Sequence, residues 1–159
     1  WDDRWKEFSD VAEKGMQIQK ELLRLVDEDT AAFNRIMEAF GLPKNSEEEK
    51  AARANAIEMA SQYAMEIPLK TAKVALEGMD ICMSMVKTGN PNSITDAGVG
   101  ALCIRTAVLG AVMNVRINAA GIKDKTFTGR LLNEAGILEK KAEEMELEVR
   151  NLVKLEIEK

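Results

Sequence analysis

The sequence has 159 residues, of which 31% are charged and none is histidine, and its formal net charge is −5. This length is typical of one domain with a substantial core. The negative charge disfavours nucleic-acid backbones and anionic membrane surfaces as partners of the whole molecule. The absence of histidine excludes Ser-His and Cys-His nucleophile pairs, and a zinc site would need distant cysteines and carboxylates, so we expect no metal centre.

Helices are expected along the whole chain, because it has only three prolines and no convincing alternation of apolar and polar residues. The first helix carries apolar residues at three- and four-residue spacing from Phe8 to Ala39, a pattern typical of packing against other helices. It should end at Gly41, since Pro43 follows.

The second helix is expected to begin at Ser46, which forms a capping-box pattern with Glu49. It should run to about Val86 with a kink at Pro68. Its methionines, such as Met79, are expected to fill the core rather than to form a binding surface.

The third helix, from about Ser93 to Ala119, is apolar nearly all round, which predicts a position at the centre of the bundle. Its apolar run is almost long enough to span a bilayer, but Arg105 interrupts it, so we expect a core helix rather than a membrane span. Cys82 and Cys103 lie in apolar surroundings without CxxC spacing and are expected to be buried, reduced thiols of a cytoplasmic protein.

The last helix is expected from about Lys125 to Ile157, with apolar residues at heptad spacing. The heptad positions are Leu131, Leu138, Met145 and Leu152. The whole chain, residues 1–159, is therefore predicted to be a single all-α domain, a mostly antiparallel up-and-down bundle with an apolar central helix.

Asp29 is a polar residue on the apolar stripe of the first helix, between Leu25 and Ala32. Burying an unpaired carboxylate in a core costs on the order of several kcal/mol of folding free energy, unless the carboxylate is hydrogen-bonded or paired. Two interpretations stay open, a buried cap or ion pair with a neighbouring helix and a functional carboxylate. Asp27, two positions away, points elsewhere.

The loop "NPNSITDAG", residues 90–98, also has two interpretations. Ser93 can cap the following helix, and Asp96 in its first turn complements the helix dipole. The loop nevertheless holds more hydrogen-bonding side chains than one helix start requires. These side chains are Asn90, Asn92, Ser93, Thr95 and Asp96.

Asn114 and Asn118 share one face of the third helix, because they are four residues apart. Buried amides need partners, so this pair indicates either an interhelical or oligomer contact or a ligand site. Lys44 and Arg53 have the pattern of surface residues and are candidates for contact with an anionic ligand.

Three segments that carry these residues resemble the formiminotetrahydrofolate cyclodeaminase and methenyltetrahydrofolate cyclohydrolase family. They are "LVDEDTAAFNRIMEAFGLPKNSEEEKAAR" (25–53), "GNPNSITDAGVGA" (89–101) and "GAVMNVRINAAGIKD" (110–124). The resemblance implies an all-helical homodimer in the cytoplasm that converts 5-formimino-tetrahydrofolate to 5,10-methenyl-tetrahydrofolate and ammonia, without metal or organic cofactor. The alternatives are hydrolysis of the methenyl bridge to 10-formyl-tetrahydrofolate, or a silent helical dimer that binds folate or a protein partner.

The resemblance also suggests roles for the polar residues. Asp29 or Asp96 is the candidate for proton transfer at the one-carbon unit. Substrate-binding roles fall to Asp27, Lys44, Arg53, Asn90, Asn92, Ser93, Asn114 and Asn118, with Lys44 or Arg53 placed at the glutamate tail of the folate, which can be a polyglutamate. Family members usually begin with a Gly-rich stretch and a small-residue helix, and we expect this chain to lack both.

Overall fold

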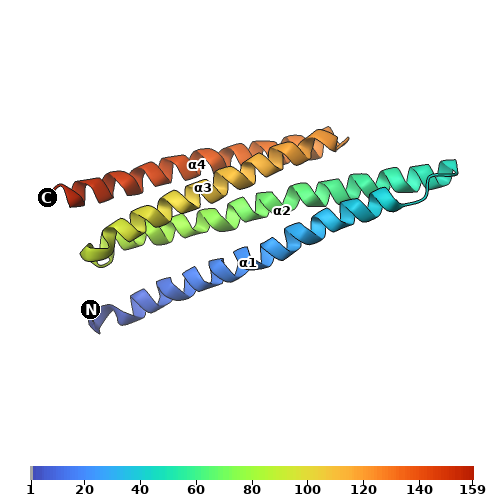
Figure 1. The fold of residues 1–159 in the computed structure, drawn as a ribbon. Helices are drawn as coiled ribbons and strands as arrows, with labels where there is room; N and C mark the ends of the chain where they lie inside the picture. Colours follow the sequence, from blue (N-terminus) through green and yellow to red (C-terminus); the bar gives the residue numbers. More distant parts are fainter. Residues whose placement is uncertain (1) are drawn as a thin grey trace.

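The computed structural model describes residues 2–159, and within that range it contains four long α-helices and no strand (Figure 1). The α-helices are α1 (Trp5–Gly41), α2 (Glu47–Thr88), α3 (Ile94–Asn118) and α4 (Lys125–Ile157). Three short 3-10 turns flank these helices: η1 (Asp2–Arg4) precedes α1, η2 (Pro91–Ser93) precedes α3, and η3 (Ala119–Gly121) follows α3. Consecutive helices run in opposite directions, which confirms the predicted all-α antiparallel bundle.

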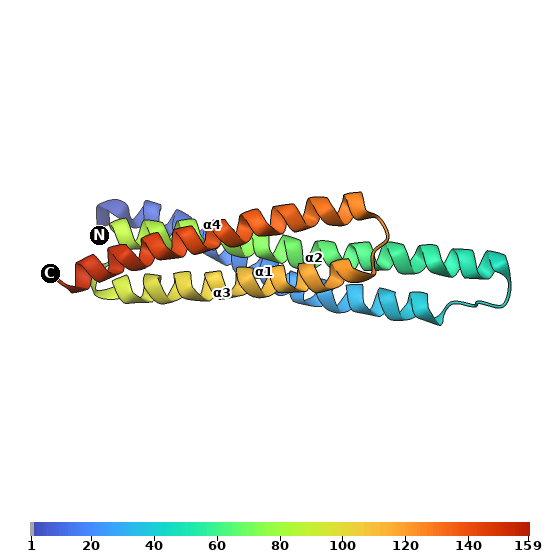
Figure 2. The ribbon, with the colours of Figure 1, turned by 90° about the horizontal axis from the view of Figure 1, so that it is seen from above.

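The longest helix, α2, packs against all three other α-helices. Its 42 residues make it about 63 Å long. The tip of the α1–α2 hairpin projects beyond the ends of α3 and α4 at the side opposite the chain termini (Figure 2). This arrangement leaves α1 with α2 as its main neighbour, so one side of α1 faces solvent.

The core has two parts, which meet along α2. The larger part lies between α2, α3 and α4 and includes the fully buried side chains of Met79, Val112 and Val149. The smaller part, between α1 and α2, contains Leu25, Ala32, Ala64 and Ile67. Full burial of a Leu, Val or Met side chain stabilises the fold by about 1.5–3 kcal/mol. The expectation that Met79 fills the core is confirmed.

The apolar helix α3 is covered on one side only. It buries Val108, Val112 and Val115 against α2 and α4, whereas only 33% of its most apolar 18-residue window is buried. By length and composition this segment, Pro91–Gly121, could also cross a membrane. Arg105, which interrupts the apolar run, forms an ion pair in the bundle, because its guanidinium lies 3.5 Å from the carboxylate of Glu143 in α4.

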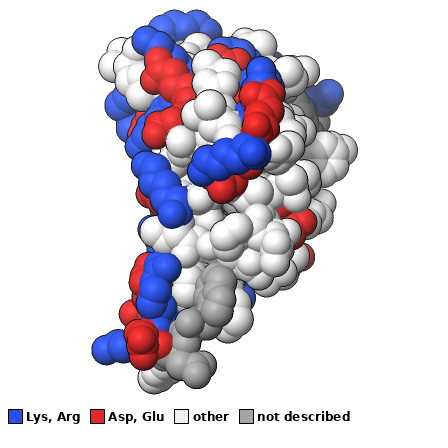
Figure 3. Space-filling model, turned by 90° about the vertical axis from the view of Figure 1, so that its left-hand side faces the viewer, with Lys and Arg blue, Asp and Glu red and all other residues white. Residues whose placement is uncertain are grey.

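The exposed side of α3 carries large apolar side chains in a row. Their exposed fractions are 59% for Val99, 44% for Leu102, 63% for Met113 and 71% for Ile117. Seen from the end of the bundle where the termini lie, charged side chains gather along one flank and the other flank is nearly uncharged (Figure 3). We call the row Val99, Leu102, Met113 and Ile117, with the small residues between them, the open face of α3.

The predicted starts of α2 and α4 agree with the structure. Ser46 and Glu49 form the complete capping box at the start of α2, and α4 has the expected bounds. Ser93 is the N-cap residue of α3, as predicted, but its side chain makes no capping hydrogen bond. The side chain of Asn90 instead accepts a hydrogen bond from the backbone N–H of Asn92 at 3.0 Å, which starts η2 one turn earlier.

The two cysteines have different surroundings. Cys82 on α2 is buried, and burial raises the pKa of its thiol. Cys103 on α3 is exposed, so its predicted burial is wrong. The reason is that α3 has no neighbour over its open face.

Candidate functional site

Asp29 lies at the edge of the α1 stripe and is exposed, which overturns the interpretation of a buried ion pair. Leu25 and Ala32 on either side of it are each only 1% exposed. Since α2 covers only one side of α1, steps of three or four residues carry Asp29 just outside the contact. The neighbouring Glu28 faces α2 instead and accepts a hydrogen bond from the hydroxyl of Tyr63 at 2.5 Å.

Asp29 and Asn114 line the same cavity, although 84 other positions separate them in the chain. This central cavity has a volume of about 430 Å³ and lies between α1, α2 and α3. Within residues 2–159, no hydrogen bond or ion pair joins either side chain to another residue, so both are free to bind a ligand. The other lining residues are Leu22, Leu25, Val26, Thr30, Pro68, Thr71, Thr106, Ala107, Gly110 and Ala111.

Three threonines line the central cavity, one from each helix, and all three bond to their own helix. The hydroxyls of Thr30, Thr71 and Thr106 donate to the carbonyl four residues earlier, at 3.2, 3.1 and 2.9 Å. Their donors are therefore already used, and the remaining wall is mostly apolar. In such surroundings the Asp29 carboxylate and the Asn114 amide are the groups that can act on a bound molecule.

Asn118 does not line the central cavity, although it lies one turn after Asn114. Its side-chain amide donates to the backbone carbonyl of Ala64 at 2.8 Å. Pro68, four residues later in α2, has no N–H to donate to that carbonyl. Asn118 thus replaces a missing helical hydrogen bond, and the structure assigns the two asparagines separate roles.

Asn90, Ser93 and Asp96 line a second cavity, which we call the loop cavity. It has a volume of about 320 Å³ and is also lined by Phe8 of α1 and by the end of α2. The Asp96 carboxylate is exposed and has no hydrogen bond or ion pair with another described residue. Asn92 is exposed and lies outside this cavity.

Lys44 and Arg53 line a third cavity, of about 420 Å³, which we call the basic cavity. Lys50 and Lys123 also line it. Its one carboxylate, Glu58, accepts hydrogen bonds from the backbone N–H groups of Lys123 and Asp124, and these bonds lower the Glu58 pKa. Four cations therefore gather at this end of a chain whose net charge is −5.

The three cavities lie far apart in one chain. Asp96 and Asn114 are separated by eighteen residues of α3, which is about 27 Å. Arg53 and Pro68, which mark the basic and central cavities on α2, are fifteen residues apart, about 22 Å. The predicted residues therefore form three groups in a single chain, and exposed Asp27 lines none of the three cavities.

Sequence reasoning missed Thr71, Thr106 and Glu58. A signal for Thr106 was present, because Thr106, Gly110 and Asn114 recur every four residues on one face of α3. A further cavity, of about 540 Å³, lies in the α1–α2 hairpin beside Tyr63 and is lined by none of the predicted residues. Within residues 2–159, no group of three or more Cys, Asp or Glu residues is placed to hold a metal ion.

Comparison with known proteins gives consistent matches. The family model described as formiminotransferase-cyclodeaminase matches residues 1–136. A methenyltetrahydrofolate cyclohydrolase from Methylorubrum extorquens is 38% identical over 128 residues, 80% of this chain and 62% of that protein. A formimidoyltransferase-cyclodeaminase from Mus musculus is 36% identical over 107 residues, 67% of this chain and 20% of that protein. This chain thus spans less than two thirds of the length of either relative.

The fold has a solved counterpart. The crystal structure of formiminotetrahydrofolate cyclodeaminase from Thermotoga maritima matches with a TM-score of 0.82 and 23% sequence identity. The match covers 97% of this chain and 73% of that one. At this identity the likeness establishes the fold.

Proposed function

This chain belongs to the formiminotransferase-cyclodeaminase family, and from that premise we propose that it catalyses a one-carbon reaction of tetrahydrofolate in the central cavity. The proposed reaction converts 5-formimino-tetrahydrofolate to 5,10-methenyl-tetrahydrofolate with release of ammonia. The observation that carries the proposal is the meeting of an unpartnered carboxylate, Asp29, and an unpartnered amide, Asn114, in one largely apolar cavity.

The reaction needs a group that moves one proton between two nitrogens. N10 of the folate attacks the formimino carbon on N5 and loses its proton, and the departing amine gains one as the C–N bond breaks. A single carboxylate placed beside that carbon can take the first proton and deliver it to the amine, and Asp29 is free to do so. Its negative charge also stabilises the cationic methenyl product.

Asn114 supports the reaction by orienting the substrate. Its side chain offers both a hydrogen-bond donor and an acceptor, which suits the amide-like edge of a pterin ring. Because Asn114 projects from α3 and Asp29 from α1, the two side chains can approach a substrate from different walls of the central cavity.

A second candidate is hydrolysis of 5,10-methenyl-tetrahydrofolate to 10-formyl-tetrahydrofolate. The observation that favours it is the similarity to the cyclohydrolase of Methylorubrum extorquens. Water then attacks the bridge carbon, N5 gains one of its protons, and the other is released. The same carboxylate serves both reactions, because each passes through a tetrahedral carbon between two nitrogens.

The basic cavity is the proposed site for the glutamate tail of the folate. Lys44 and Lys123 make no ion pair with another described residue, and Arg53 donates to the carbonyl of Phe40 at 3.1 Å. The distance of about 22 Å along α2 from the central cavity favours substrates with several glutamates. A tail of that length carries the negative charge that this cavity complements.

We further propose that this helical domain is cytoplasmic, forms homodimers and needs no cofactor. The open face of α3 supports the dimer, because Leu102, Met113 and Ile117 would otherwise remain in water. The acid-base groups that the reaction requires are side chains of this chain, which supports catalysis without a cofactor.

An absorbance assay of 5,10-methenyl-tetrahydrofolate tests the proposal. Its appearance from the 5-formimino compound identifies the deaminase, and its accelerated loss to the 10-formyl compound identifies the hydrolase. If neither rate exceeds that of the buffer, the chain is a silent helical protein, and binding of folate measured by calorimetry decides whether it is a folate carrier.

A further inference from the structure

The unpartnered carboxylates Asp29 and Asp96 occupy separate cavities in one chain, yet the two cavities open on the same flank of α3. Asp96 and Asn114 are eighteen residues apart, which is about five complete turns, so both side chains leave α3 in the same direction. Each cavity by itself offers one free carboxylate. The single chain thus has two incomplete polar sites on one flank, about 27 Å apart.

The size of the side chains on the open face of α3 changes symmetrically on either side of its middle. Small side chains occupy its middle, at Cys103, Thr106 and Gly110, and a Cβ added at Gly110 would meet no atom within 4 Å. Large apolar side chains follow on both sides, from Val99 and Leu102 before the middle to Met113 and Ile117 after it. A face with small residues at its centre lets a second helix approach closely, and its symmetry suits pairing with a copy of itself.

We propose that two copies pair antiparallel through this face, and that Asp96 of the partner subunit completes the site built on Asp29 and Asn114. A two-fold axis at the level of Thr106 places Leu102 against Gly110 of the partner subunit, so that a large side chain enters a gap. It also places Val99 against Met113 of the partner subunit.

The same axis joins the two incomplete sites. Asp96 lies ten residues before Thr106 and Asn114 eight after it, so Asp96 of the partner subunit comes within one helical turn of Asn114. An axis perpendicular to the helices keeps each residue on its own flank, and these two residues share a flank. Each dimer then has two equivalent sites, and every site takes Asp29 and Asn114 from one chain and Asp96 from the other.

This inference rests on the proposed function, and subunit complementation tests the two separately. Asp29→Asn and Asp96→Asn chains with different affinity tags are co-expressed, and the mixed dimer is isolated by two successive affinity steps. Each homodimer should lose about a hundredfold in turnover. The mixed dimer should recover to roughly half of the wild-type rate, because one of its two sites then contains no substitution.

The matched control is a mixed dimer of Asp29→Asn and Asn114→Ala chains. Both substitutions fall in the same half of the shared site, so both sites of this dimer stay impaired and no recovery is expected. If the first mixed dimer also fails to recover while the wild type is active, the shared site is refuted. An inactive wild type would instead refute the proposed function.

A second measurement tests, without an activity assay, whether residue 96 of one subunit lies close to residue 114 of the other. In a chain freed of cysteine by Cys82→Ala and Cys103→Ala, the pair Asp96→Cys and Asn114→Cys is treated with a short bis-maleimide reagent. A covalent dimer should form with both cysteines present and not with either alone, since each is distant from its own counterpart across the axis. A protein that remains monomeric, or dimers that do not become cross-linked, would overturn the proposal whether or not the wild type is active.

Discussion

The side-chain amide of Asn118 in α3 donates a 2.8 Å hydrogen bond to the backbone carbonyl of Ala64 in α2. That carbonyl is unpaired within its own helix because Pro68 has no N–H. The hydrogen bond therefore couples the end of α3 to the one place in α2 where the helical ladder is broken, next to the wall of the central cavity that Pro68 forms.

Replacing Asn118 by alanine should lower the free energy of unfolding by about 1–3 kcal/mol, the usual cost of leaving a buried carbonyl unpaired. In a Pro68→Ala background the loss should be clearly smaller, because residue 68 then supplies its own N–H to Ala64. Urea unfolding of the four proteins in this double-mutant cycle measures the difference. Asn114→Ala, which removes an amide without a partner, should change stability by less than about 0.5 kcal/mol. Equal losses at Asn118 in both backgrounds would contradict the assigned role.

Acid should remove the stabilisation that Glu21 provides through its ion pairs with Arg24 within α1 and with Lys70 of α2. Hydrogen bonds from Arg24 and Lys70, both at 2.8 Å, lower the Glu21 pKa from 4.5 to about 2. Because the folded-state pKa is the lower one, this stabilisation is present above pH 4.5 and disappears as the pH falls towards 2. Glu21→Gln should therefore flatten the decline of unfolding free energy in this pH range, as measured by urea titration. If Glu21→Gln leaves the pH profile unchanged, the ion pairs of Glu21 contribute nothing to stability. The control is Glu13→Gln, an exposed substitution on the same helix, which should show the same pH profile as the wild type.

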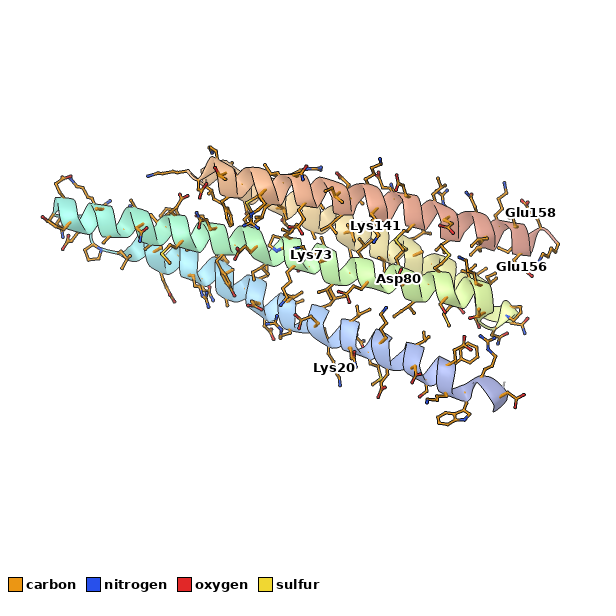
Figure 4. All side chains as sticks on the ribbon, turned by 180° about the vertical axis from the view of Figure 1, so that it is seen from behind. Lys20, Lys73, Asp80, Lys141, Glu156 and Glu158 are labelled. Atoms are coloured by element: carbon orange, nitrogen blue, oxygen red, sulfur yellow. The ribbon has the colours of Figure 1, made fainter. Side chains whose placement is uncertain are left out.

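A charge on the open face of α3 should dissociate the proposed homodimer. Leu102→Glu introduces a carboxylate where 44% of the leucine is exposed in the single chain, and burying it against a partner would be unfavourable. Light scattering should report a dimer for the wild type and a monomer for this variant, while the far-ultraviolet circular dichroism stays helical. Lys141→Glu on the surface of α4 is the control and should leave the dimer intact (Figure 4). A wild-type monomer would contradict the proposed assembly.

Removal of a cation from the basic cavity should affect only substrates with a long tail. Lys44→Ala and Lys123→Ala should each raise KM for a polyglutamylated folate several-fold, since a surface charge contact contributes about 0.2–1 kcal/mol. The kcat, and the KM for the monoglutamate, should not change. Steady-state kinetics with both substrates measures these values. An equal rise of KM for the polyglutamate and the monoglutamate would show that the basic cavity does not bind the glutamate tail.

The sequence was sufficient to predict where the helices begin and end, but not which residues at the border of each helix contact are buried. Capping chemistry at Ser46 and the break after Gly41 depend on local residues, so the ends of these helices followed directly. Whether Asp29 is buried depends instead on how many helices cover α1, and periodicity alone does not contain that number. The equal spacing of Asn114 and Asn118 likewise hid their difference, because the partner of Asn118 is created by a proline fifty residues earlier in another helix.

The central claim is that the carboxylate of Asp29 moves the proton in the central cavity. Formation of 5,10-methenyl-tetrahydrofolate from the 5-formimino compound, and its loss by hydrolysis, are followed by absorbance for the wild type and Asp29→Asn. Asp80→Asn serves as the matched control, because Asp80 is an exposed carboxylate of α2 without a partner among the described residues (Figure 4). The account predicts a loss of about a hundredfold or more in turnover for Asp29→Asn, with unchanged stability and a fully active control. Wild-type turnover in the Asp29→Asn protein would contradict it.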